Sequence, residues 1–267
     1  MRAKQWGCGM SLHYVSFSSL HDAPLAIGAR LRLPQAATHK HPAILILHGS
    51  AGPSLREGGY ADVLNEAGFV TLEPDQWAAR GLRGGADGRP KTVLETLPDV
   101  YGARAFLAAH PSVDPKRIGV MGFSFGGVAT MLAATRAQTE KFLGEFAALM
   151  PVYPVCWTYN HVPGFEFRDL VDAPIQLVTG ALDQYDNDPE AGPKLVASLP
   201  AADRARIRAT VMAQAHHGFD MPGIDMEVQD PFGNQGKGGP LTMRYNADAT
   251  QQSHRLAVEF FTRALAR

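Results

Sequence analysis

The sequence predicts an α/β fold in which a mostly parallel central sheet is flanked by helices on both faces. Short runs rich in Ile, Val and Leu are each followed by a polar or Gly/Pro turn and then by a helical pattern. These runs are apolar at consecutive positions, as strands buried between two helical layers must be. Because no repeat, low-complexity linker or charge block marks a boundary, we expect one domain over residues 1–267.

The individual elements follow from this alternation of strand and helix. The expected central strands are 43–47, 68–72, 117–122 and 174–180, with further strands at 146–150 and 209–212. Residues 12–17 and 26–33 are expected as antiparallel edge strands. Helices are expected around 60–67, 97–109, 128–137 and 249–264, the last with one apolar side that suits docking on the sheet.

The segment 218–248 differs from the rest of the chain. It contains three prolines and many glycines, and it is longer than a structureless connection in a compact domain usually is. We therefore predict that it is a functional surface loop.

Composition and charge narrow the classes of function. The chain is 45% apolar and 19% charged, the balance of a soluble globular protein. With 25 basic and 26 acidic residues its net charge is −1, which predicts no attraction to nucleic acid or anionic lipid. No apolar run approaches the ~20 residues that span a bilayer, and residues 1–10 lack a signal-peptide pattern. A cytoplasmic location and a small-molecule ligand are the resulting expectations.

The two cysteines, Cys8 and Cys156, are too few for a disulfide framework and lack the spacing of a zinc site. A single bridge between them stays open. No metal or organic cofactor is predicted from the sequence.

The segment Gly122-Phe123-Ser124-Phe125-Gly126 matches the pattern G-x-S-x-G and follows an expected strand directly. In that context the chain turns sharply from strand into helix, which exposes the serine and requires small neighbours. Ser124 would then lie at a helix N-terminus, where the dipole favours a developing oxyanion. The alternative is a glycine-rich turn with an incidental serine. We predict that Ser124 is a nucleophile.

A serine hydroxyl needs a base to remove its proton, and the base needs a carboxylate to orient it. Asp183 follows the expected strand 174–180, at the sheet edge where catalytic groups collect; Asp186 and Asp188 are close competitors. His217 lies after the strand 209–212, where the last member of the triad belongs, and His216 is its rival. A metal-binding histidine pair is the lesser alternative, since no further ligands follow at a recognisable spacing.

The oxyanion hole is expected to use two backbone N–H groups. One belongs to Phe125, which follows the nucleophile, and the other to the loop after the strand 43–47. Ser50 is the preferred second donor and Ala51 the alternative, although the segment 48–53 could also be a simple turn.

Four motifs together resemble the dienelactone hydrolase family of α/β hydrolases. They are HGSAG after one strand, DPKRIGVMGFSFGG around Ser124, GALDQY after a later strand and HHGF near the end, and they span roughly residues 43–267. The resemblance implies an α/β-hydrolase fold, a triad of Ser124, Asp183 and His217, and an oxyanion hole at Ser50 and Phe125.

This sequence departs from the family pattern at two positions. Characterised dienelactone hydrolases use a cysteine nucleophile where Ser124 stands, and they carry a glutamate where Gly49 stands. A broader serine esterase is therefore implied. The segment 75–81 resembles a family segment whose arginine meets a substrate carboxylate, which makes Arg80 a candidate anion-binding residue, with a structural salt bridge as the alternative.

Aromatic residues near the triad in the sequence could line an apolar substrate pocket, although aromatics more often belong to the core. The candidates are Trp77, Tyr153, Trp157 and Phe219. Cys156 is expected to be a small buried hydrophobe.

Taken together, these patterns predict a serine hydrolase that cleaves a carboxylic ester or lactone through an acyl-enzyme intermediate. Two alternatives remain open. One is a peptidase built on the same core, although the chain lacks the several hundred residues of a propeller; the other is a non-catalytic binding protein with the same fold.

Overall fold

The structure is a computed structural model that describes residues 11–34 and 40–266. Within these residues eight strands form one sheet, in the order β1-β2-β4-β3-β5-β6-β7-β8. The pairs β1–β2 and β2–β4 are antiparallel and the rest are parallel, which confirms the predicted sheet and its edge strands. The strands are β1 (Ser11–Ser18), β2 (Ala26–Leu33), β3 (His41–Leu47), β4 (Val70–Asp75), β5 (Val113–Phe123), β6 (Ala148–Val152), β7 (Ile175–Gly180) and β8 (Ile207–Met212).

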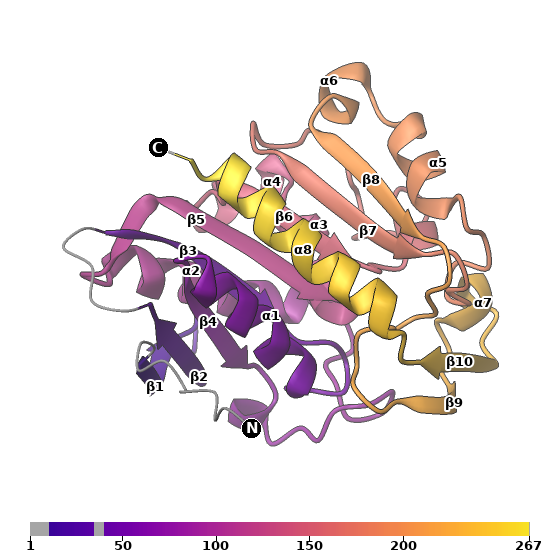
Figure 1. Ribbon diagram of the computed structural model, residues 1–267, viewed down its shortest axis with the longest axis horizontal. Helices are drawn as coiled ribbons and strands as arrows, with labels where there is room; N and C mark the ends of the chain where they lie inside the picture. The colour runs from indigo at the N-terminus through magenta and orange to yellow at the C-terminus, as the bar shows by residue number, and fades with distance from the viewer. Residues whose placement is uncertain (1–10, 35–39, 267) are drawn as a thin grey trace, which may run out of the picture.

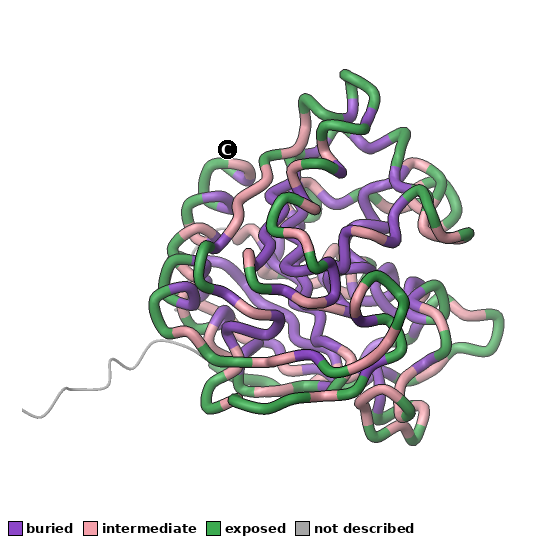
Figure 2. Tube along the Cα trace, turned by 90° about the vertical axis from the view of Figure 1, so that its right-hand side faces the viewer, coloured by how far each residue is buried: buried purple, intermediate pink, exposed green. Residues whose placement is uncertain are grey.

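Helices cover both faces of the sheet, because each central strand is apolar on both sides. In β3, Ile44 and Ile46 pack with α1 (Leu55–Glu66) and α8 (Ala247–Ala264), which lie side by side over one face in Figure 1. Leu45 and Leu47 point the other way. That face is covered by α2 (Leu97–Ala109), α3 (Phe125–Ala133) and α5 (Ala191–Ser198), with the short helices α4 (Arg136–Phe142) and α6 (Ala201–Arg204) nearby in the chain. Figure 2 shows the strands as the buried centre beneath a partly exposed shell of helices and loops.

The helix after Ser124 is shorter than the sequence predicted. α3 ends at Ala133 instead of continuing to residue 137, because Thr135 takes an extended conformation and caps a separate helix. Thr135 also pairs with Leu170 through an isolated β-bridge, so tertiary pairing overrides the local helix preference.

The segment 218–248 has secondary structure of its own. It contains β9 (Asp225–Gln229), α7 (Gly233–Gly236) and β10 (Pro240–Arg244), and β9 pairs antiparallel with β10. The alternating pattern of the two strands places Val228 opposite Leu241, and Leu241 is buried against Val155 and Tyr185. The segment is thus a short hairpin held on the main domain, which Figure 1 shows at the edge beyond α8.

None of the helices in residues 11–34 and 40–266 is long and apolar enough to cross a membrane.

Candidate active site

The turn between β5 and α3 holds Ser124 in a strained backbone conformation. Its φ of 51° and ψ of −113° are rare for a residue with a side chain. The N–H of Ser124 donates a 3.0 Å hydrogen bond to the carbonyl of Val152 in the neighbouring strand. A Cβ on Gly122 would lie 2.2 Å from the carbonyl oxygen of Gly126, and one on Gly126 would lie 2.5 Å from that of Leu47. Both glycines are therefore required by close backbone approach.

The structure brings together the three side chains predicted as a triad. Ser124 Oγ lies 2.8 Å from His217 Nε2, and His217 Nδ1 lies 2.8 Å from Asp183 Oδ2. Asp183 is in the loop after β7 and His217 in the loop after β8, so the three residues meet where parallel strands end. An ionised carboxylate can only accept, which assigns the proton to Nδ1. Nε2 then accepts from the Ser124 hydroxyl.

The competing acids lie elsewhere. Asp186 accepts the backbone N–H groups of Cys156 and Trp157, at 3.1 and 2.8 Å. Burial, and secondarily the negative charge of Asp183, raise the pKa of Asp186 to about 7. Asp188 pairs with Lys194 at 2.6 Å near the surface. Neither carboxylate hydrogen-bonds to His217 within the described part of the chain.

His216, the rival histidine, lies on a different side of the loop. It lines a shallow surface pocket together with Asp183, Gln184 and Thr242, and does not line the cavities that contain Ser124.

His48 shapes the loop that carries the predicted oxyanion donor. The N–H of Gln76 donates to His48 Nε2 at 3.1 Å, so the ring proton is on Nδ1, which donates to the Gly49 carbonyl at 2.8 Å. Burial lowers the pKa of His48, which keeps this imidazole neutral. A Cβ on Gly49 would lie 3.6 Å from Ser124 Cβ, so the loop passes directly beside the serine.

The N–H groups of Ser50 and Phe125 make no hydrogen bond to other described residues. Phe125 is the first residue of α3, where N–H groups are left free by the helix geometry. Both donors therefore remain available at the serine.

Trp77 supports this loop from below and does not form part of a substrate cavity. It is 2% exposed, and its indole Nε1 donates to the Ser50 carbonyl at 3.0 Å. Its ring packs edge-on against Phe125 with centroids 5.2 Å apart. The expectation that Trp77 binds substrate is corrected accordingly, since the side chain is buried against the loop that contains Ser50.

Arg80 has a structural role as well. Its guanidinium pairs with Asp99 at 2.8 Å and donates to the Gln76 carbonyl at 2.8 Å. Asp99 is fully buried and needs this positive charge. Arg80 is absent from the described lining of the cavities at Ser124, so the anion-binding expectation is corrected in favour of the salt bridge.

Tyr153 is buried beneath the histidine and is not among the described residues that line the cavities at Ser124. Its ring lies 4.7 Å from that of His217, and its hydroxyl bonds to both Arg56 and Asp220. Arg56 in turn pairs with Glu57 at 2.6 Å. Tyr153 is thus a support for the imidazole, and the substrate-binding expectation is again corrected.

Two other candidates from the sequence are also buried. Phe219 packs on Tyr153, with ring centroids 5.4 Å apart. Cys156 is buried as expected, and this burial raises the pKa of its thiol. Cys8, its possible partner, lies outside the described residues.

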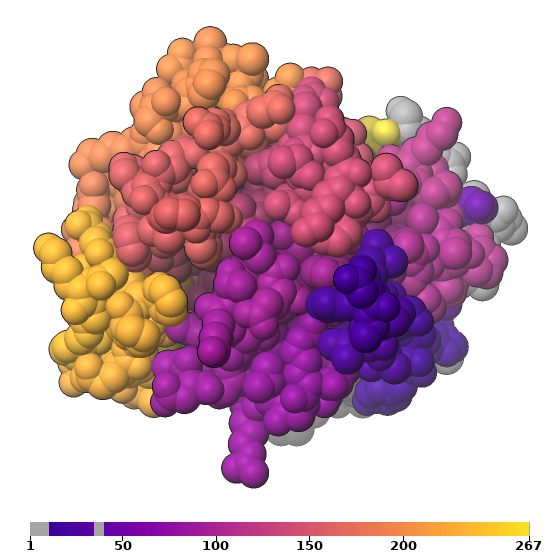
Figure 3. Space-filling model, turned by 180° about the vertical axis from the view of Figure 1, so that it is seen from behind, coloured from indigo at the N-terminus to yellow at the C-terminus, as the bar shows by residue number. Residues whose placement is uncertain are grey.

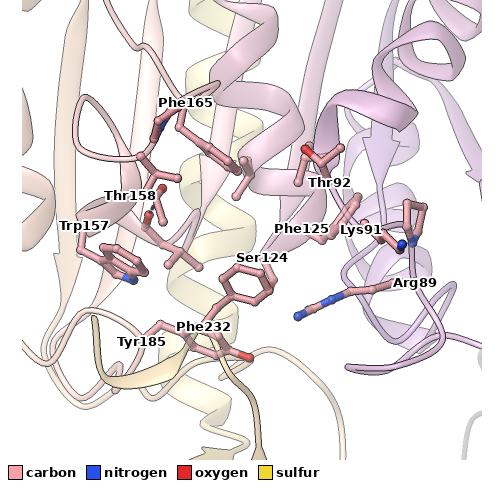
Figure 4. A pocket seen from close by; sticks show the side chains of 16 residues that line it. Arg89, Lys91, Thr92, Ser124, Phe125, Trp157, Thr158, Phe165, Tyr185 and Phe232 are labelled. Atoms are coloured by element: carbon pink, nitrogen blue, oxygen red, sulfur yellow. Dashed lines mark hydrogen bonds between the residues drawn. The ribbon is translucent and has the colours of Figure 1, made fainter. Parts of the chain in front are cut away.

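Two cavities open at Ser124. The first, about 360 Å³, lies over α3 and is shown in Figure 4. Trp157 lines it, with Val93, Phe125, Val128, Val155, Val162, Phe165 and Phe232 among its other apolar residues. The second, about 320 Å³, lies beneath the β9–β10 hairpin and contains His217. Both volumes fall in the range of small-molecule sites, about 300–1,000 Å³.

Sequence reasoning missed three residues at this site. Tyr185 packs its ring 4.2 Å from that of His217 and donates its hydroxyl to Asp230 at 2.9 Å. Asp230 also pairs with Arg89 at 3.2 Å. Tyr185 could have been suspected from its place two residues after Asp183. Arg89 and Asp230 carry no local signal, because only the tertiary fold brings the two segments together. Figure 3 shows the gold surface of the hairpin segment beside the purple surface of an earlier part of the chain.

The arrangement has the chemistry of acyl transfer, since a hydroxyl, a base and free N–H donors converge on one point. Within the described residues, no three His, Cys, Asp or Glu side chains cluster as metal ligands.

The family model and the similar solved structures point to the same family. The family model described as "Dienelactone hydrolase family" matches residues 27–265, whereas no curated protein matches the sequence. A dienelactone hydrolase-like promiscuous phosphotriesterase from metagenomic libraries superposes with a TM-score of 0.66 at 16% identity, covering 97% of this chain and 100% of the other. The dienelactone hydrolase of Anabaena variabilis gives 0.61 at 20% identity, covering 96% and 99%.

A longer protein shares the same core. The acylaminoacyl peptidase of Pyrococcus horikoshii gives a TM-score of 0.64 at 18% identity, covering 97% of this chain but 42% of the peptidase. At these identities the similarity concerns the fold alone, and it confirms the predicted α/β-hydrolase fold.

Proposed function

Because the chain belongs to the dienelactone hydrolase family, we propose that it is a serine hydrolase that cleaves a carboxylic ester or lactone of a small molecule. Ser124 is the nucleophile, His217 the general base and Asp183 the carboxylate that orients the base. One observation carries the proposal: Ser124, His217 and Asp183 form a continuous hydrogen-bonded chain, with both distances 2.8 Å, on a strained turn that opens into two cavities.

The first half of the reaction forms the acyl-enzyme. Ser124 Oγ attacks the carbonyl carbon while His217 Nε2 takes the hydroxyl proton. The negative charge moves to the former carbonyl oxygen, where the N–H groups of Ser50 and Phe125 stabilise it. As the tetrahedral intermediate collapses, the bond to the alkoxy oxygen breaks, and His217 returns the proton to the leaving alcohol.

The second half releases the acid. A water molecule gives a proton to His217 and attacks the acyl carbon, and the proton then returns to Ser124 Oγ as the ester bond to the serine breaks. Asp183 holds the imidazole with Nδ1 protonated throughout. With a lactone, the alcohol formed in the first half stays attached to the acyl group.

Gly49 supports a serine nucleophile at this position. A Cβ at residue 49 would lie 3.6 Å from Ser124 Cβ and 3.1 Å from a guanidinium nitrogen of Arg56, so a glutamate there would add an acidic side chain beside the serine. The glycine removes that charge and leaves His217 as the base in hydrogen-bond contact with Ser124.

The test is hydrolysis of p-nitrophenyl acetate by the purified chain and by Ser124→Ala. We expect the variant to lose several orders of magnitude in kcat. Ser16→Ala, on the exposed strand β1, is the matched control and should retain full activity. A fluorophosphonate probe should label the wild type and the control but not Ser124→Ala.

Other outcomes would redirect the proposal. If the wild type and Ser124→Ala hydrolyse esters equally, Ser124 is not the nucleophile. If no ester, no lactone such as dihydrocoumarin and no fluorophosphonate reacts, the non-catalytic binding protein becomes the better description. Cleavage of N-acylated dipeptides without ester turnover would favour the peptidase.

A further inference from the structure

The two cavities at Ser124 adjoin each other and share part of their lining. Ser124 and Tyr185 line both of them. Tyr185 is anchored in place by its hydroxyl bond to Asp230, and Asp230 is held by Arg89. Figure 4 shows the side chains of Tyr185 and Phe232 on the side of the first cavity away from Thr92 and Phe165. An ester bound at Ser124 can therefore place its two halves in different surroundings.

The position of His217 decides which half enters which cavity. His217 lines the second cavity and is not among the described residues that line the first. The leaving alkoxy oxygen must lie next to His217 Nε2, because this atom gives it a proton. The second cavity also contains Ser50, one of the two proposed oxyanion donors. The alcohol half therefore leaves through the second cavity, and the acyl half extends from Ser124 past Phe125 into the first.

The lining of the first cavity specifies what kind of acyl group fits. Aromatic side chains enclose it from several elements, namely Phe125, Trp157, Phe165, Tyr185 and Phe232, with valines between them. Flat aromatic and aliphatic walls of this kind bind apolar rings through burial and edge or stacked contacts. A volume of about 360 Å³ is far larger than an acetyl group requires.

The charged residues of this cavity do not alter that conclusion. The guanidinium of Arg89 is paired with Asp230 and lies over the ring of Phe232 at 5.3 Å from its centroid. Lys91 is exposed, so its ammonium group stays hydrated at the mouth. The cavity has no buried unpaired charge among its described lining residues that would call for an ionised acyl group.

We propose that this chain is selective for esters of uncharged aryl-alkanoic acids, whose acyl group occupies the cavity lined by Phe125, Trp157, Phe165 and Phe232. This assignment rests on the proposed function of Ser124 and adds the substrate class and its orientation. The second cavity, lined by Met221, Met226, Met243, Ile224 and Val228, receives the alcohol. Methionines adapt their shape, so the alcohol half is less strictly selected.

A pair of isomeric esters tests the orientation. Methyl hydrocinnamate carries a phenyl ring on its acyl side and a methyl alcohol, whereas phenethyl acetate has the same atoms with the ester reversed. Two matched variants narrow one cavity each. Val162→Phe fills the first cavity and Val228→Phe the second; both valines are partly exposed, and each lines one of the two cavities at Ser124 but not the other.

We expect wild-type kcat/KM to be at least ~10-fold higher for methyl hydrocinnamate than for methyl acetate. Val162→Phe should lower kcat/KM for methyl hydrocinnamate by ~10-fold or more and leave phenethyl acetate within about twofold. Val228→Phe should show the opposite pattern. Unchanged thermal melting and fluorophosphonate labelling of both variants establish that the fold and Ser124 are intact.

The alternatives are distinguishable. If the variants affect the opposite isomers, or each affects both isomers equally, the orientation is wrong although the esterase function stands. If methyl acetate is cleaved as well as methyl hydrocinnamate, the aryl-alkanoyl selectivity is wrong and the function again stands. If a lactone is cleaved but no ester, the substrate class is wrong and the proposed function stands. If Ser124 labels with fluorophosphonate but neither an ester nor a lactone is cleaved, or if nothing reacts at Ser124, the proposed function fails and the substrate class with it.

Discussion

The phenol ring of Tyr185 packs on the imidazole of His217, with centroids 4.2 Å apart and planes inclined by 42°. Hydrogen bonds hold this tyrosine at its backbone and at its side-chain hydroxyl. Its backbone N–H donates to Asp183 Oδ1 at 2.9 Å, and its hydroxyl donates to Asp230 at 2.9 Å. Tyr185 therefore links the acid that orients His217 to the hairpin that covers the site.

This link predicts a graded response at position 185. Tyr185→Phe keeps the ring on His217 and loses one hydrogen bond, worth ~0.5–1.5 kcal/mol, so kcat/KM should fall between about two- and tenfold. Tyr185→Ala also removes the ring, frees the imidazole to move and joins the two cavities, so we expect at least a further tenfold loss. Steady-state kinetics with methyl hydrocinnamate measure both. Wild-type activity in Tyr185→Ala would show that the ring contact has no role in placing His217.

Asp183 and Asp188 provide a matched pair of carboxylates in one loop. Asp183→Asn should lower kcat by roughly 10³–10⁴-fold, because an amide at this position no longer selects the imidazole tautomer with Nδ1 protonated. Asp188→Asn, whose partner is the surface residue Lys194, should leave kcat unchanged. Measuring kcat for the two variants decides between the acids. A large loss in Asp188→Asn with none in Asp183→Asn would exchange their roles.

The strained turn predicts that Gly122 tolerates no side chain. A Cβ there would lie 2.2 Å from the Gly126 carbonyl oxygen, and backbone cannot yield as a flexible side chain does. We expect Gly122→Ala to destabilise the fold by more than about 3 kcal/mol, measured by urea unfolding. Gly28→Ala on β2, where an added Cβ meets nothing within 4 Å, should change stability by less than ~0.5 kcal/mol. Equal stability of the two variants would mean that the turn relaxes without cost.

The raised pKa of Asp186 predicts that the stability of the fold depends on pH. Burial raises its pKa in the folded state from 3.8 to about 7, so between these values the folded chain binds the proton more tightly than the unfolded chain does. Its contribution to stability is present below pH 3.8 and is lost as the pH rises through about 7. Asp186→Asn cannot titrate, so its melting temperature should fall less than that of the wild type between about pH 5 and 8.

The comparison with Asp186→Asn isolates this group, since Asp220 and Asp99 also have pKa values raised by burial and remain in both proteins. The variant also loses one of the two backbone hydrogen bonds that Asp186 accepts, at a cost of ~1 kcal/mol at all pH values. Parallel melting curves across the range would mean that Asp186 is ionised in the folded chain throughout.

Local patterns were sufficient to predict the sheet, its edge strands and the three residues of the proposed triad. An apolar run such as 43–47 can be recognised as a strand in the sequence, because a strand buried between two layers must be apolar on both faces. Ser124 can be recognised as a candidate nucleophile for a similar reason, since the turn requires Gly122 and Gly126 within two residues of it. These constraints act between residues close together in the chain, so the sequence displays them directly.

The surroundings of the triad were decided by the tertiary structure. Trp77, Tyr153 and Arg80 stand near motif residues in the sequence, yet each is committed to a buried partner: the Ser50 carbonyl, Asp220 and Asp99. Conversely, Arg89 and Asp230 meet across 141 positions of chain and divide the site into two cavities. The direction in which a side chain points, and what lies opposite it, depend on how distant segments pack. The sequence by itself therefore determined the fold and the candidate chemistry, whereas only the packed structure decided the shape of the space in which a substrate would lie.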